Sequence, residues 1–213
     1  MNFIFDMDGV LINSNAAHLK SWKRIADQDG VEFTNEIFWK TFGKTSESIV
    51  ENYWGSAPLS PEQIADVVER KETAFRESVR DLVKPIDGAL DFVGLLAARG
   101  DKLALGSSAP RINAEYVLEL FGFKQFFEER IVAGDEVLQG KPAPDIFLEA
   151  AKKLGEPPER CIVIDDSRSG VKAGRRAGAI VIGFFSEGHV EEEYEDANYV
   201  VKSFDEIKSL FKL

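Results

Sequence analysis

Short apolar runs alternate with amphipathic stretches along most of the chain. After a run such as Leu103–Leu105, apolar residues recur at helical spacing and polar residues fill the positions between them. This alternation is typical of a parallel sheet with helices on both faces. We predict strands at Phe3–Phe5, Leu103–Leu105, Ile131–Ala133, Cys161–Ile164, Ile180–Ile182 and Tyr199–Val201.

The amphipathic stretches predict the helices that cover this sheet. They span residues 89–98, 111–120, 144–154 and 168–177. Gly155 and Gly178 directly follow the last two stretches. Glycine there is a suitable C-cap, because many helices end in a left-handed residue.

One long segment near the N-terminus lacks this alternation. It contains no convincing strand, and Leu19, Trp22 and Ile25 form an apolar stripe at helical spacing. Farther along, Ser60 precedes Pro61 and has the sequence of a capped helix start. We therefore predict a core domain of residues 1–14 and 82–213 and a helical domain of residues 15–81, inserted after the first strand.

Composition restricts the possible partners. The chain has 213 residues, with 26 basic and 37 acidic side chains and a net charge of -11. A surface of this sign disfavours nucleic acid and anionic membranes. A single cysteine, Cys161, excludes an internal disulfide, and no apolar run approaches the ~20 residues of a membrane helix. We expect a cytoplasmic protein, a monomer or weak homodimer, that acts on a small phosphorylated metabolite.

Polar residues gather where the predicted strands end. The carboxyl ends of parallel strands meet at one edge of a sheet, where ligands bind in folds of this type. The inserted segment leaves from the end of the first strand, so it can close over the same edge. The residues expected there are Asp6, Asp8, Ser107, Ser108, Lys141, Asp165 and Asp166.

The four acidic residues of this group suggest a metal site. Carboxylates crowded together repel one another, and a divalent cation removes the conflict. Oxygen ligands favour Mg²⁺. Asp6 can then attack phosphorus as a nucleophile, and Asp8 can act as the acid and base. Ser107 and Lys141 can hold the phosphoryl oxygens.

These residues occur in four motifs that resemble those of the haloacid dehalogenase superfamily. Asp6 and Asp8 match the first motif, Asp-x-Asp-Gly-Val. Ser107 matches the second and Lys141 the third, here in the form Lys-Pro-x-Pro-Asp. The acidic pair Asp165 and Asp166 matches the fourth. The motifs stand in the family's order, and the resemblance extends over essentially the whole chain.

The resemblance implies a Rossmann-like three-layer α/β core and a small helical-bundle cap. It also implies that Asp6 is the nucleophile and Asp8 the acid and base. Mg²⁺ would be bound by Asp6, the backbone carbonyl of Asp8 and Asp166. Asp165 stands where many relatives have glutamate, and it would contact the metal through water.

Within the superfamily, the chain is most similar to the β-phosphoglucomutase and sugar-phosphatase branch. His18, Trp22, Lys71 and the segment 43–46 match that branch. Its mutases end this segment with an arginine that binds a second phosphate, whereas this chain has Ser46. Serine cannot replace a guanidinium clamp, so the difference favours a phosphatase. The substrate-binding residues that we predict are His18, Gly43, Lys44, Thr45, Lys71, Ser108 and Arg111.

Several functions remain open at this stage. We favour a Mg²⁺-dependent phosphatase that forms an aspartyl-phosphate. A phosphomutase is the alternative if Lys44 or Arg111 replaces the missing arginine. A haloacid dehalogenase needs neither a metal nor Asp8, and a silent binding module does not require all four motifs.

Overall fold

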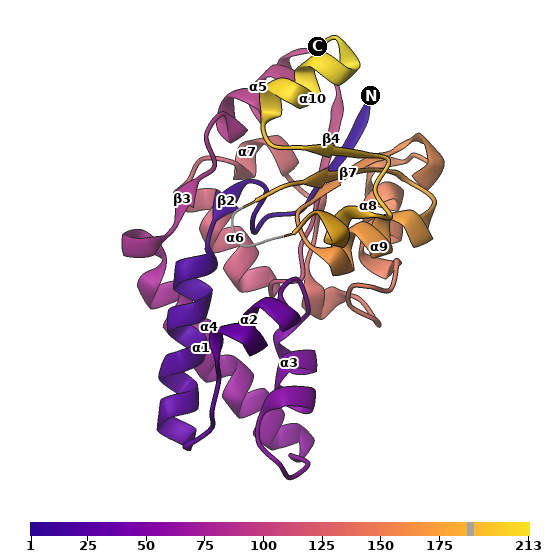
Figure 1. Ribbon diagram of the computed structural model, residues 1–213. Coiled ribbons are helices and arrows are strands. Elements are labelled where there is room, and N and C mark those ends of the chain that lie inside the picture. The colour runs from indigo at the N-terminus through magenta and orange to yellow at the C-terminus, as the bar shows by residue number, and fades with distance from the viewer. Residues whose placement is uncertain (187–189) are drawn as a thin grey trace.

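A computed structural model describes residues 1–186 and 190–213 (Figure 1), so that His189 lies outside the described residues. Its strands are β1 (Asn2–Phe5), β2 (Ile12–Asn13), β3 (Lys84–Pro85), β4 (Lys102–Gly106), β5 (Ile131–Val132), β6 (Ile162–Asp165), β7 (Ile180–Phe184) and β8 (Tyr199–Val201). Its α-helices are α1 (Asn15–Asp29), α2 (Asn35–Thr41), α3 (Ser46–Tyr53), α4 (Pro61–Leu82), α5 (Ala89–Ala98), α6 (Arg111–Leu120), α7 (Lys124–Phe127), α8 (Asp145–Leu154), α9 (Arg168–Ala177) and α10 (Phe204–Phe211).

Six parallel strands form one sheet in the order β5-β4-β1-β6-β7-β8. The central strand β1 pairs with β4 and β6, and Phe3 lies opposite Leu103 on one side and Ile162 on the other. All six predicted strands are present, and the predicted α/β fold with a parallel sheet is confirmed. Their carboxyl ends lie at a single edge of the sheet, because all six strands run in the same direction.

Alternate residues of the strands face two separate hydrophobic cores. In β1, Phe3 and Phe5 pack with α5, α6, α7 and α10, whereas Ile4 packs with α8 and α9 on the opposite face. β6 follows the same two-residue period, with Ile164 on the first face and Val163 on the second. Burial on both faces explains why these strands are apolar throughout.

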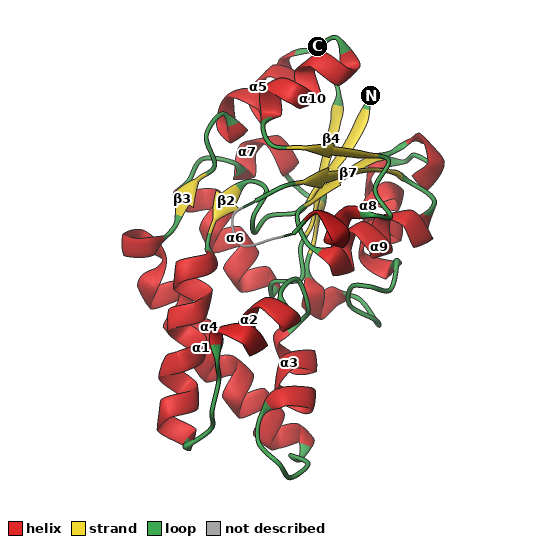
Figure 2. Ribbon diagram, viewed as in Figure 1, coloured by secondary structure: helices red, strands yellow, loops and turns green. Residues whose placement is uncertain are grey.

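Helices α1 to α4 lie together beyond the sheet edge (Figure 2) and have a hydrophobic core of their own. Trp22, Phe33 and Trp54 pack within that core. α4 begins with the capping arrangement expected from the sequence, in which Ser60 Oγ accepts a hydrogen bond from the Gln63 N–H. None of the helices in the described part of the chain is long and apolar enough to cross a membrane.

A short antiparallel pair joins the two ends of this helical segment. β2 pairs with β3, so that Ile12 lies opposite Pro85 and Asn13 opposite Lys84. The sequence did not predict this pair, because two-residue strands are too short to carry a period. The pair holds the entry and exit of the helical segment side by side.

Candidate active site

Three buried carboxylates meet at the carboxyl end of the sheet. Asp6 follows β1, Asp165 ends β6 and Asp166 comes directly after it. One ligand atom from each lies within 4.8 Å of the others. They come together because β1 and β6 are neighbouring parallel strands. The exposed fraction is 5% for Asp6 and 0% for the other two, so the three charges stand in a poorly solvated site.

Lys141 joins this cluster from the loop between β5 and α8. Its Nζ lies 3.0 Å from Asp6 Oδ1 and 2.7 Å from Asp165 Oδ2. Burial raises the pKa of Asp6 well above its usual value; Lys141 opposes this shift, and the neighbouring Asp165 and Asp166 add to it. Burial alone would lower the pKa of Lys141, but the two carboxylates reverse the effect and keep the ammonium charged.

The donor set of this cluster suits Mg²⁺, which prefers oxygen ligands. Two glycines leave the space that the carboxylates occupy: a Cβ on Gly9 would lie 1.6 Å from Asp166 Oδ2, and one on Gly170 would lie 1.9 Å from Asp165 Oδ2. Asp166 is also oriented by Ser186 Oγ, which donates to its Oδ2 at 2.8 Å. Asp6, Asp165 and Asp166 can therefore hold a divalent cation.

Two serines follow β4 at the same edge. Ser107 is buried, and its Oγ accepts a hydrogen bond from the Ala109 N–H at 3.2 Å. Ser108 Oγ donates to the Gly43 carbonyl at 3.1 Å, and this bond connects the sheet edge to the loop between α2 and α3. That loop approaches closely, since a Cβ on Gly43 would lie 2.4 Å from Ser167 Oγ.

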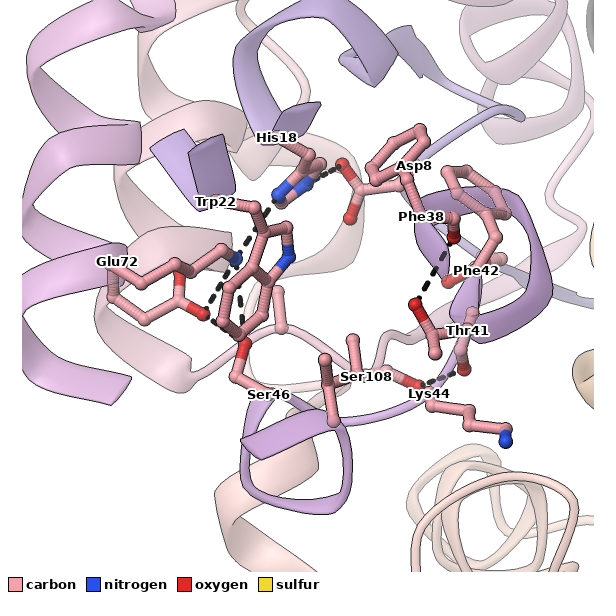
Figure 3. Close-up of a pocket in the computed structure, with 15 residues that line it drawn as sticks. Asp8, His18, Trp22, Phe38, Thr41, Phe42, Lys44, Ser46, Glu72 and Ser108 are labelled. Carbon is pink, nitrogen blue, oxygen red and sulfur yellow. Dashed lines mark hydrogen bonds and ion pairs between the residues drawn. The ribbon is translucent and has the colours of Figure 1, made fainter. Parts of the chain in front are cut away.

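A pocket opens beside the cluster, between the sheet edge and the helical segment (Figure 3). Asp6 and Asp8 line it at the sheet edge, and helices α1 to α4 supply most of the remaining lining residues. Its lining residues are Asp6, Asp8, His18, Trp22, Phe38, Thr41, Phe42, Gly43, Lys44, Ser46, Ile49, Lys71, Glu72, Ser108 and Ala109. The pocket wall therefore contains both aromatic and polar side chains.

Asp8 faces the helical segment. Its Oδ1 accepts hydrogen bonds from Ser14 Oγ and from His18 Nε2, the latter at 3.1 Å. Lys71 Nζ lies 3.2 Å from His18 Nδ1, and an ammonium only donates, so His18 carries its proton on Nε2. Burial opposes the shift, but His18, Ser14 and Lys71 outweigh it and lower the pKa of Asp8.

Five of the seven predicted substrate-binding residues line the pocket: His18, Gly43, Lys44, Lys71 and Ser108. The other two lie elsewhere. Thr45 caps α3 by accepting a hydrogen bond from the Ser48 N–H, and the Arg111 guanidinium forms an ion pair with Glu136. Substrate contact therefore stays a prediction for the first five, and the contacts of Thr45 and Arg111 give it no support.

Sequence reasoning missed part of the pocket wall. Phe38, Thr41, Ile49 and Glu72 were not singled out, although all four line the pocket. For Glu72 a signal existed: it lies four residues after Val68 and three before Phe75, on the buried face of α4. A carboxylate at an apolar position of an amphipathic helix is unusual unless it is paired.

Comparisons with known proteins agree with this architecture. The profile of the family described as haloacid dehalogenase-like hydrolase matches residues 1–178. A fructose-1-phosphate phosphatase of Escherichia coli K12 (YqaB) is 31% identical over 179 residues, which cover 82% of this chain and 91% of that protein. A bifunctional riboflavin kinase/FMN phosphatase of Arabidopsis thaliana is 33% identical over 210 residues. These are 96% of this chain but 54% of that protein, so the chain spans about half of that relative's length. A crystal structure of β-phosphoglucomutase from Clostridium difficile is 26% identical and superposes with a TM-score of 0.84, over 99% of this chain and 94% of that one.

Proposed function

We propose that this chain, which belongs to the haloacid dehalogenase-like hydrolase family, is a Mg²⁺-dependent phosphatase of small sugar phosphates. The enzyme class predicted from the sequence, a phosphoric monoester hydrolase, is confirmed by relatives that are named phosphatases. The observation that carries the proposal is the buried group of Asp6, Asp165, Asp166 and Lys141 beside a pocket that residues from both parts of the chain line.

The chemistry would proceed in two steps. An oxygen of Asp6 bonds to phosphorus, the ester P–O bond breaks, and the leaving oxygen takes a proton from Asp8. A water molecule then gives a proton to Asp8 while its oxygen attacks phosphorus, which releases phosphate and restores Asp6. When bound, the cation supplies positive charge that offsets repulsion between the nucleophile and the phosphoryl group.

Lys141 and Ser107 would act on the phosphoryl oxygens. The Lys141 ammonium already lies within ion-pair distance of Asp6, so a phosphoryl group on Asp6 would be within its reach. Such preorganised donors stabilise the charge that develops in the transition state. Ser107 is held at the same strand end by its backbone N–H, which donates to the Val132 carbonyl at 3.0 Å.

The lowered pKa of Asp8 favours the second of these two steps. A lowered pKa keeps Asp8 ionised and ready to accept a proton from water in the second step. The first step needs the protonated form, and a dianionic substrate close to Asp8 raises its pKa. His18 would then orient Asp8 through the hydrogen bond from Nε2.

In this proposal the helical segment, residues 15–81, acts as a cap on a core of residues 1–14 and 82–213. The contacts of Gly43 with Ser108 and Ser167 support a closed arrangement. Closure would exclude bulk water and place the helical wall against the leaving group. A cytoplasmic location and a monomeric or weakly dimeric state belong to the same proposal.

A phosphomutase is the second candidate, favoured by the similarity to β-phosphoglucomutase. A mutase must bind a bisphosphate in two orientations, which requires a cation at the far end of the pocket. Ser46 occupies the end of the loop where the mutases of this branch have arginine, and Arg111 is engaged with Glu136. These features favour hydrolysis over internal transfer.

The test is phosphate release from a panel of sugar monophosphates with Mg²⁺, with EDTA, and with the Asp6→Asn variant. We expect release only from the wild-type protein with Mg²⁺, and an unchanged circular dichroism spectrum for the variant. Release by Asp6→Asn would exclude this nucleophile, and release in EDTA would exclude the metal. Conversion of glucose 1-phosphate to glucose 6-phosphate without free phosphate would establish the mutase instead.

A further inference from the structure

A buried chain of polar groups leads from Asp8 across the pocket wall into α4. Beyond His18 it reaches Lys71, whose Nζ lies 2.9 Å from Glu72 Oε1. Ser46 Oγ donates to the same oxygen of Glu72. Figure 3 shows His18, Ser46 and Glu72 on one side of the pocket, around Trp22. Lys71 and Glu72 are 2% and 3% exposed, so their charges are poorly screened by solvent.

The other oxygen of Glu72 is fixed from the opposite side. Asn113 Nδ2, on α6, donates to Glu72 Oε2, and Asn113 Oδ1 accepts from Arg76 Nη1 at 2.7 Å. The carboxylate is therefore held by groups from α3, α4 and α6 and cannot swing out of the wall. Burial alone would raise the pKa of Glu72, but Lys71, His18 and the hydrogen bonds of Lys71 and Ser46 outweigh it and lower the pKa, so the group stays ionised.

Among the residues that the structure describes, this arrangement leaves no available cation at the far end of the pocket. The charge of Lys71 is compensated by Glu72 at contact distance. The Lys44 side chain runs away from the open space in Figure 3, and its Nζ lies 5.5 Å from the centre of the Tyr53 ring. Trp22, Phe38, Phe42 and Ile49 add apolar side chains to the pocket wall. A second phosphate placed there would lose its hydration and meet a fixed carboxylate.

We propose that Glu72 is a specificity-determining residue that restricts the substrate to monophosphates whose leaving group is uncharged, with hydroxyl groups and an apolar face. The proposal rests on the phosphatase function above. Glu72 does this in two ways: it neutralises Lys71, which otherwise would attract a second anion, and it repels that anion directly. The aromatic wall meanwhile suits the apolar face of a sugar ring.

The test compares Glu72→Gln with Glu69→Gln, an exposed glutamate one turn earlier on α4. The substrates are the panel monophosphate that the wild type hydrolyses best and the bisphosphate of the same sugar. The readout is the ratio of the two kcat/KM values, which a general loss of stability would not shift. We expect the wild type to prefer the monophosphate at least about tenfold, and Glu72→Gln to reduce that preference about tenfold, as expected for the removal of one buried charge.

A second variant protects the test against misfolding of Glu72→Gln. Ser46→Lys keeps Glu72 and adds a cation to the same end of the pocket, so its preference should shift in the same direction. An unchanged ratio in both variants, or a wild type that hydrolyses the bisphosphate equally well, would overturn this inference and leave the phosphatase function standing. Failure to hydrolyse any monophosphate would overturn the phosphatase function, and this inference with it.

Discussion

Replacing Gly9 by alanine tests whether Asp166 belongs to a metal site. Gly9 has φ +73°, and an added Cβ would lie 1.6 Å from Asp166 Oδ2 and 2.2 Å from its Cγ. Gly9 and the Asp166 carboxylate are both buried, so neither residue can move into solvent. The Asp166 carboxylate must therefore shift, or the turn after β1 must open.

The size of the effect follows from this geometry. Ordinary contact requires the carboxylate to retreat by about 2 Å. Mg²⁺–oxygen bonds are about 2.0–2.1 Å long and tolerate little distortion, so Asp166 would no longer reach the ion. Mutation of a residue that only hydrogen-bonds to a metal ligand typically costs about 10–100-fold in metal affinity or activity. Loss of the ligand itself should therefore cost about 100-fold or more. The positive φ adds about 1–2 kcal/mol of backbone strain.

The assay is a Mg²⁺ titration of phosphate release, combined with urea unfolding. Gly100→Ala is the matched control, because Gly100 has φ +79° and no atom within 4 Å of its added Cβ. It should show the backbone strain without the loss of metal affinity. A Gly9→Ala protein that responds to Mg²⁺ as Gly100→Ala does would refute the assignment of Asp166 as a ligand.

Two further predictions concern the buried charges. Lys141→Met leaves Asp6 and Asp165 without their shared partner. It should lower the free energy of unfolding of the metal-free protein by about 3–5 kcal/mol, measured by urea unfolding at neutral pH. A loss below about 1 kcal/mol would show that the ion pairs are not maintained in solution. The folded-state pKa of Glu72 is lowered, so the unfolded chain binds more protons near the ordinary pKa of about 4.3, and the stability that Glu72 provides is lost as the pH falls through that region. Glu72→Gln should therefore flatten the acid limb of the stability curve between pH 6 and 3, and parallel curves for variant and wild type would contradict the ionised state.

The sequence predicts the six strands of the sheet and four of the helices that cover it, because each of these carries its own periodic signal, whereas α7 and α10 were not predicted. Helices α5, α6 and α9 have the predicted bounds, and α8 begins one residue later, at Asp145. The meeting of Asp6 with Asp165 and Asp166 also follows from the sequence, since parallel strands end at one edge. The β2–β3 pair was missed because its partners, Ile12 and Pro85, are joined only by tertiary structure.

The pocket wall is harder to predict than the cluster. Phe38 and Phe42 look like ordinary core residues, and only the approach of the loop between α2 and α3 to the sheet edge decides that they line the pocket. The partners of Glu72 come from three helices, and no local pattern relates Asn113 to it. Pairings between helices of a cap and a core depend on their relative placement, which a periodic pattern does not specify.

The two buried lysines illustrate why similar residues can serve different purposes. Lys141 and Lys71 are both almost fully buried, and each forms an ion pair with a carboxylate. The partners of Lys141, Asp6 and Asp165, belong to the candidate metal site, so a bound cation would compete for them and leave the ammonium available to a phosphoryl group. Glu72 has no such competitor among the described residues, and its carboxylate stays with Lys71. Positive charge is then available at Asp6, the proposed nucleophile, and neutralised at the far end of the pocket, which is the distribution that a monophosphate requires.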